Sequence, residues 1–192
     1  TTLSLATGAP DDDAWEILDY NVGEAWPLRS AAWGATSAHS QVSQSCPNSS
    51  VVGVSGSVDG RFAVLCSDGR LGWHAGPGVP TVAPALDRAE FVTFSHFQLA
   101  PDGERVVVAG TEGRVAVYER VTRRMWSLAP TRTGEVRRLA LAPAGDRVAI
   151  VRERGGVELY TVPELRPLGG IPAGDVHDLR LFDDGSVLVA GP

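Results

Sequence analysis

Lysine is absent from this 192-residue sequence: all 17 basic residues are arginine, and 23 acidic residues give a formal net charge of −6. The acidic balance argues against a surface that follows nucleic-acid phosphates, because such surfaces need clustered basic side chains. Long apolar runs are also missing, since no stretch approaches the roughly 18 consecutive apolar residues that span a bilayer. We therefore expect neither nucleic acid nor a membrane as a partner. The exclusive use of arginine indicates GC-rich coding, as in some bacteria.

Targeting signals and a cysteine framework are lacking too. Residues 1–4 have neither a basic n-region nor the start of an apolar h-region, so no secretory signal is recognised and a cytoplasmic location is expected. Two cysteines are too few for a disulfide framework. Cys66 alternates with Phe62 and Val64 in an apolar run, and we expect it to be a small buried core residue. A disulfide to Cys46 is the alternative.

Patterns for metal binding or catalysis are missing as well. The four histidines show no His-x-x-x-His spacing and no Cys-x-x-Cys occurs, so no zinc site is expected. Residues 11–13 are three aspartates without a loop of spaced ligands, which indicates a solvated turn rather than a calcium site. No glycine-rich phosphate loop appears, nor any carboxylate pairing that argues for general acid–base chemistry. We expect a non-catalytic protein without a cofactor or metal.

The sequence does contain an internal repeat. Turn glycines, each followed by β-branched residues, recur at intervals of 43, 42 and 40 residues. They are Gly60, Gly103, Gly145 and Gly185, and the aromatic residues Trp73, Tyr118 and Tyr160 keep step with them. A period of about 40–45 residues with four short strands per unit is typical of β-propeller blades. The repeat therefore predicts an all-β propeller of four-stranded antiparallel blades.

Each repeat also makes local physical sense. Asp-Gly at 102–103 and 184–185 supplies the positive φ that a tight hairpin turn needs, and we expect a similar turn at 59–60 and 144–145. The β-branched strands that follow suit burial between neighbouring blades. We expect Val64, Val107 and Ile150 in the core, with Glu112 and Arg132 exposed on turns.

The unit resembles the Trp-Asp repeat, whose core reads roughly Ser-Pro-Asp-Gly, a strand, a turn, then Val-x-Ile-Trp-Asp. The matching segments are 100–103 with 115–119, and 142–145 with 157–161. The resemblance covers roughly residues 50–191 well and 1–49 loosely. The Trp-Asp dipeptide and the Gly-His before the first strand are missing, which implies that the His-Asp hydrogen-bond relay of the family is absent or degenerate here.

We expect residues 1–192 to form one propeller or propeller segment. The predicted blades are residues 50–86, 94–130 and 136–172, with further strands at 2–8, 14–19, 24–28, 176–183 and 186–191. That total of 17 strands is one too many for four closed blades of four. Three alternatives remain: a segment of a longer propeller, a four-bladed ring closed by its own ends, and an eight-bladed ring built from two chains, which is a homodimer.

The resemblance implies a protein-interaction or sensor scaffold, the propeller part of a multidomain bacterial regulatory protein in signalling. Its partner would be a protein or another propeller segment. The alternative is an enzyme or small-molecule binder that uses the central channel, but no His, Asp or Glu residues were found in register near the axis.

One feature, a long inter-blade loop at residues 30–50, is not explained by the repeat. In the blade topology, turns between second and third strands share one rim with the links between blades. We therefore predict partner contacts on that rim. The predicted contact residues are Trp33, His39, Glu112, Arg132, Arg154 and Asp175.

Overall fold

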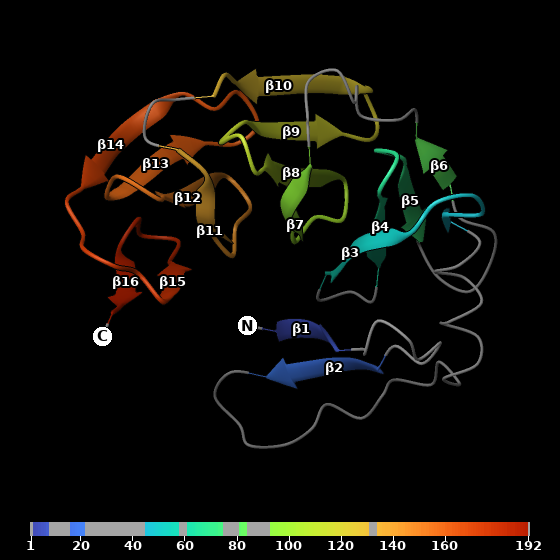
Figure 1. Ribbon diagram of the computed structural model, residues 1–192, viewed down its shortest axis with the longest axis horizontal. Coiled ribbons are helices and arrows are strands. Elements are labelled where there is room, and N and C mark those ends of the chain that lie inside the picture. The colour runs from blue at the N-terminus through green and yellow to red at the C-terminus, as the bar shows by residue number, and fades with distance from the viewer. Residues whose placement is uncertain are drawn as a thin grey trace. The chain divides into compact units, whose positions relative to one another are not determined.

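The computed structural model describes residues 2–7, 16–21, 45–57, 61–74, 81–83, 93–130 and 134–191 (Figure 1). These residues form sixteen β-strands in antiparallel sheets, so the prediction of an all-β fold is confirmed. The chain divides into two compact units, Thr1–Leu86 and Asp87–Pro192. None of the described segments contains a helix long and apolar enough to cross a membrane.

The first unit holds one two-stranded and one four-stranded sheet. β1 (Thr2–Thr7) pairs with β2 (Glu16–Asn21). The four-stranded sheet follows chain order and consists of β3 (Val51–Gly56), β4 (Phe62–Cys66), β5 (Leu71–His74) and β6 (Thr81–Ala83). A four-stranded antiparallel meander within the predicted span 50–86 is what the repeat requires of a blade.

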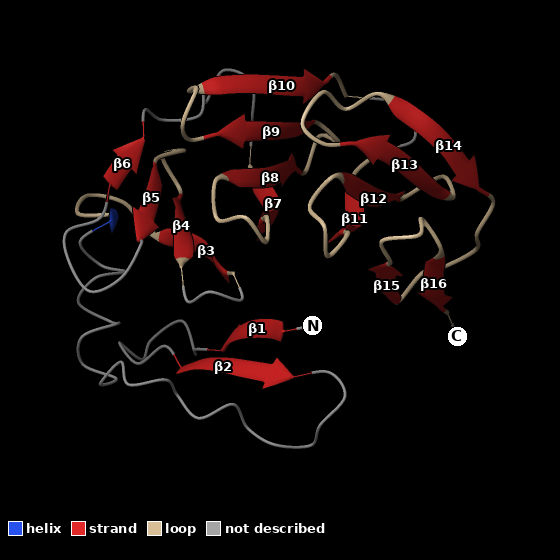
Figure 2. Ribbon diagram, turned by 180° about the vertical axis from the view of Figure 1, so that it is seen from behind, coloured by secondary structure: helices blue, strands red, loops and turns tan. Residues whose placement is uncertain are grey.

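The second unit holds two four-stranded sheets and a final two-stranded one (Figure 2). The first sheet consists of β7 (Phe94–Leu99), β8 (Arg105–Gly110), β9 (Val115–Glu119) and β10 (Arg124–Leu128). The second consists of β11 (Val136–Leu141), β12 (Arg147–Arg152), β13 (Val157–Thr161) and β14 (Pro167–Ile171). The last pair is β15 (Asp178–Leu181) and β16 (Val187–Ala190).

The strands near the amino terminus differ in detail from the prediction. β2 spans Glu16–Asn21, two residues later than the expected 14–19. The expected strand at 24–28 lies outside the described residues, which is why sixteen strands are seen where 17 were predicted.

The hairpin turns form where the repeat places glycine. Gly103 and Gly145 adopt φ angles of 67° and 71°, which L-residues with a Cβ rarely adopt, and Gly185 does the same at 85°. Each of these glycines donates its N–H to the carbonyl three residues earlier, closing the turn between the first and second strands. The turn predicted at 59–60 lies outside the described residues.

The core of the second unit consists of apolar layers between consecutive sheets. Val107 and Ile150 belong to the layer that joins β7–β10 to β11–β14. Ala149 and Leu179 belong to the layer that joins β11–β14 to β15–β16. Val107 and Ile150 are fully buried, as is Val64 in the first unit, so the predicted core positions are confirmed. Since the sheet β11–β14 buries both faces against neighbouring sheets, its stability comes from stacking.

Candidate functional site

A rim of turns and links forms at one end of the strands in the second unit. We call it the linker rim; it comprises residues 111–114, 134–135, 153–156 and 172–177. Its segments contact one another directly: the Glu153 N–H donates to the Glu135 carbonyl at 2.9 Å. A Cβ on Gly156 would collide with the Ile171 carbonyl oxygen, so glycine is needed there for close backbone approach.

A buried arginine fixes two of these segments. The Arg152 side chain is fully buried, and its Nε lies 2.9 Å from Glu158 Oε2. Its Nη1 donates to the carbonyl oxygens of Gly113, at 2.5 Å, and Gly134, at 3.5 Å. Tyr160 donates its hydroxyl to the same Glu158 oxygen, and burial, followed by the Glu158 charge, raises the pKa of Tyr160. Because Gly113 lies in the preceding blade, Arg152 ties the turns of two blades together.

Three of the predicted contact residues lie on the linker rim: Glu112, Arg154 and Asp175. Arg154 and Asp175 are exposed, as a contact residue must be. The other three predicted contacts fall outside the described residues. They are Trp33, His39 and Arg132, and with them most of the predicted loop at residues 30–50.

The expectation that Glu112 is exposed is wrong. Glu112 is only partly exposed to solvent, and both of its carboxylate oxygens are buried without a hydrogen-bond partner. The physical reason is Gly110, where an added Cβ would collide with the Glu112 carboxylate. The missing side chain leaves space into which the carboxylate folds back over its own turn. Glu112 is therefore a less suitable contact than its charge suggested.

The first strands of successive blades carry a feature that the sequence reasoning missed. β7 and β11 each contain a β-bulge at the same repeat position, Ser95 in one and Arg137 in the other. A bulge breaks the alternation of side chains and re-aims them. In β11 the two consecutive residues Arg137 and Arg138 are accordingly both exposed. We call the six residues at and after this position the first-strand strip: Ser95, His96, Arg137, Arg138, His177 and Asp178.

Polar residues stand in register on these first strands. His96, Arg138 and Asp178 each lie seven residues before the turn glycine of their blade. Counting back from those glycines would have found them. Their strands are neighbours, since β11 contacts both β7 and β15, and Figure 2 shows these first strands on the inner side of the second unit, with β10 and β14 on its outer side.

The strip is held by short polar contacts. Arg138 donates from Nε to the His177 carbonyl at 2.8 Å and from Nη1 to the Arg137 carbonyl at 2.6 Å. Arg137 lies 3.2 Å from Glu153 and 3.9 Å from Glu135, which partly neutralise it. The pKa of His96 is lowered, chiefly by burial and further by the Arg138 charge, while the backbone of Arg137 and the Glu135 charge oppose the shift. His96 is therefore neutral at neutral pH.

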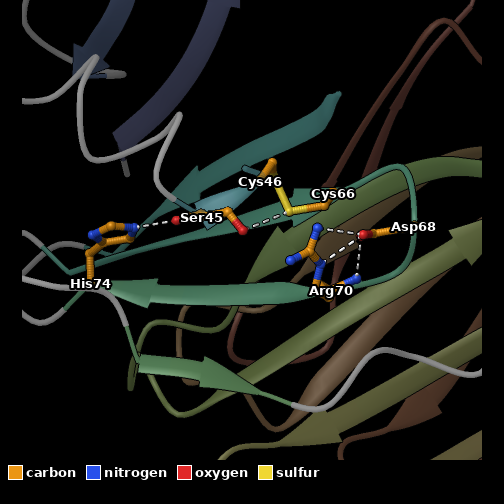
Figure 3. Close-up of a disulfide and its surroundings, with 6 residues drawn as sticks. All are labelled: Ser45, Cys46, Cys66, Asp68, Arg70 and His74. Carbon is orange, nitrogen blue, oxygen red and sulfur yellow. Dashed lines mark hydrogen bonds and ion pairs between the residues drawn. A yellow bond between two sulfur atoms is a disulfide. The ribbon is translucent and has the colours of Figure 1, made fainter. Parts of the chain in front are cut away.

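A second polar cluster lies in the first unit, where a disulfide joins Cys46 to Cys66 (Figure 3). The expectation that Cys66 is an unpaired core residue is therefore wrong, although its burial is confirmed. The pairing follows from the position of residues 45–50, which place the Cys46 Cα 5.6 Å from that of Cys66. A Cβ on Gly72 would lie 2.5 Å from Ser45 Oγ, so this segment packs directly on β5.

Beside the disulfide, Ser45 Oγ lies 2.8 Å from His74 Nε2 (Figure 3). The imidazole also stacks on Phe62, with ring centroids 4.1 Å apart, and burial lowers the pKa of His74 to about 4. A serine and a histidine at this distance resemble a nucleophile and its base. Here only 1% of Ser45 and 2% of His74 are exposed, and His74 Nδ1 has no partner to orient it. A substrate cannot reach this pair, which acts as a packing contact.

Comparison with known proteins identifies the fold. No family model matches the sequence, and no curated protein matches it. Among solved structures 631 chains match, and one of them belongs to the "Crystal Structure of Mitotic Checkpoint Complex". The TM-score is 0.57 at 16% identity, over 72% of this chain and 44% of that one. The fold is a β-propeller. The likeness shows the fold alone, and the chain spans less than half of the compared chain's length.

The last sheet of the second unit has two strands, β15 and β16, whereas the two preceding sheets of this unit have four. A cavity of about 420 Å³ lies between this sheet and β12–β14. The lining residues are Asp146, Arg147, Leu159, Thr161, Leu168, Leu181 and Gly185. The charged groups of this lining, Asp146 and Arg147, lie within ion-pair distance of each other, at 3.6 Å.

Proposed function

We propose that the chain is a non-catalytic scaffold that binds a protein partner through the linker rim of its second unit. One observation carries this proposal: the rim presents the exposed Arg154 and Asp175 beside turns that are tied together by the buried Arg152 and by the Glu153–Glu135 backbone hydrogen bond. Prior ordering of a surface lowers the entropy that binding must overcome. Arg154 and Asp175 supply one charge of each sign on it, which suits recognition of a polar protein surface.

A second candidate is a small-molecule binder that uses the inner face of the blades. The in-register row of His96, Arg138 and Asp178 favours it, because converging polar groups on adjacent strands can orient a ligand. The row is part of a wider strip in which the residues of β11 and those at the start of β15 are exposed, however, and the cavity lies elsewhere. A protein partner fits that width better.

The setting of the scaffold is proposed on two grounds. The arginine-only basic composition supports a bacterial regulatory protein. The disulfide supports an oxidising compartment rather than the cytoplasm, because cytosolic proteins rarely retain such bonds. Trapping thiols in the native host tests this: unreactive Cys46 and Cys66 support an oxidising location, and full alkylation supports the cytoplasm.

The sheet β15–β16 supports a further kind of partner. β16 pairs only with β15 among the described strands, so its other edge has no strand partner there. Another propeller segment, including a second copy of this chain, is the partner with matching chemistry.

Partner capture from the native host tests the rim, with two matched arginines of one blade. Arg154 is exposed on the linker rim, and Arg166 is exposed on the opposite turn, between β13 and β14. We expect Arg154→Glu to weaken capture about tenfold or more and Arg166→Glu to leave it unchanged. Capture that resists Arg154→Glu and Asp175→Arg but fails with Arg166→Glu would place the working surface on the other side.

A further inference from the structure

The first-strand strip is a built feature of the repeat and not an accident of one strand. β3–β4 has a register shift between Val51 and Gly53, β7–β8 between Phe94 and His96, and β11–β12 between Val136 and Arg138. Aligned on the turn glycines, these are one repeat position. Bulges of this kind commonly re-aim side chains at functional sites. In this chain each blade presents different chemistry there, and only β11 presents two arginines.

Arg138 differs from the arginines that pair within the second unit. Its guanidinium is held by two backbone carbonyl oxygens, those of His177 and Arg137, and no carboxylate contacts it in the described residues. Five other arginines of this unit lie within ion-pair distance of a carboxylate. These pairs are Arg105–Asp102, Arg120–Glu104, Arg137–Glu153, Arg147–Asp146 and Arg152–Glu158. Arg138 is thus an exposed, oriented cation whose charge is not neutralised by a salt bridge.

The surroundings of Arg138 leave that charge uncompensated. Arg137 adds a second cation, although Glu153 and Glu135 partly neutralise it. Asp178 uses its Oδ1 to accept a hydrogen bond from the Leu179 N–H at 2.9 Å. Among the described residues of the strip, Arg138 is therefore the cation without an ion pair.

We propose that the first-strand strip recognises an acidic segment of the partner protein, and that Arg138 binds a Glu or Asp carboxylate of that segment. This inference rests on the proposed function. A guanidinium presents its donors as a planar fork that matches a carboxylate, and such charge-assisted pairs are stronger than neutral hydrogen bonds. The two carbonyl contacts fix the fork before binding, so little side-chain freedom is lost on association. Neighbouring His96 and Ser95 offer neutral polar groups to the peptide backbone.

Titration of the full chain with acetylated tetraglutamate amide tests the proposal, followed by the ¹⁵Nε resonances of arginine and by calorimetry. We expect the Arg138 resonance to shift and Arg138→Gln to weaken binding about tenfold or more, since a charged hydrogen-bonded pair is lost. Arg138→Lys keeps the charge without the fork and should fall between the two. Arg166→Gln, an exposed arginine on another turn, is the matched control and should bind as the wild type does.

Two further arms separate the outcomes. Inorganic phosphate binding as tightly as the peptide, or equal loss with Arg166→Gln, would overturn the proposal in favour of general anion attraction. Partner capture with Arg138→Gln separates it from the scaffold function. Capture that fails with Arg154→Glu but survives Arg138→Gln would overturn the acidic anchor and leave the scaffold standing. Loss of capture with both variants, at an unchanged melting temperature, supports both.

Discussion

Two blades of the same repeat are secured in different ways. The sheet β3–β6 is held by residues 45–50, which precede the repeat and which we call the clasp. The clasp is attached through the Cys46–Cys66 disulfide and the contact between Ser45 and His74. The sheet β11–β14 is secured by its neighbours, through apolar layers on both faces and the buried Arg152. Both have the same strand order and turn positions. The repeat therefore specifies the blade, while the means of fixing it to its surroundings is local.

The difference shows what each kind of support can do. A stack of blades spreads its stability over many apolar contacts between neighbours. The clasp has only a few residues and little apolar surface to bury, so it is attached to β4 by a covalent bond to Cys66. We expect damage to the stack to spread through the second unit, and damage to the clasp to remain in the first.

The largest expected effect is at Arg152. Replacing it with Met leaves two carbonyl groups without their partner and Glu158 with only Tyr160, and breaking a buried ion pair costs about 3–5 kcal/mol. Urea unfolding should show this loss. Arg154→Met, two residues along and exposed, is the control and should change stability by no more than about 0.5 kcal/mol. Equal losses in the two variants would contradict the role of Arg152 as the tie between blades.

The clasp should have the next largest effect. The double change Cys46→Ala and Cys66→Ala removes a link between residues 20 apart in sequence, which is expected to cost about 3 kcal/mol. Hydrogen exchange should show faster exchange in β4 and β5 while β8 and β12 keep their protection. Reductant should reproduce this result in the wild type and leave the double variant unchanged. Loss of protection in β12 would refute the separation of the two supports.

Much of the fold could be predicted from the sequence because its signals are local. Turn glycines such as Gly103 and Gly145 need a positive φ that the sequence states directly. The disulfide could not be predicted, because it depends on where residues 45–50 pack, and no periodicity describes that segment.

The candidate site was predicted less well. Glu112 was predicted to be exposed because a charged residue on a turn usually faces water. The sequence does not reveal the space beside Gly110 that receives its carboxylate. The row formed by His96, Arg138 and Asp178 could have been predicted from the sequence, since each residue lies seven positions before a turn glycine. The bulge in β11, which exposes two consecutive side chains, could not have been predicted.

A smaller effect is expected at the turns that repeat between blades. Ala at Gly145 would be held at a φ of 71° with its Cβ 3.2 Å from Pro101 Cδ of the preceding blade. The left-handed conformation alone costs roughly 1–2 kcal/mol. Gly174→Ala is the control, since a Cβ there meets nothing within 4 Å. Thermal unfolding should separate the two variants, and equal melting temperatures would contradict the need for glycine at this turn.

The smallest effect, and the one with the least usual sign, is expected at Glu112. Its carboxylate is buried without a hydrogen bond, so Glu112→Gln should leave stability unchanged or raise it by up to about 1 kcal/mol, because a charge without a partner is removed.

Glu104→Gln is the matched control in the same blade. Glu104 accepts two hydrogen bonds from Arg120, at 2.8 Å each, and holds the pKa of that arginine above its usual value. Since this pair is partly exposed, its loss should lower stability by no more than about 1 kcal/mol. If urea unfolding shows a gain in stability for Glu112→Gln and a loss for Glu104→Gln, the contribution of a turn carboxylate is decided by whether its charged atoms have a partner. A loss at Glu112 as large as at Glu104 would show instead that Glu112 has a partner in solution.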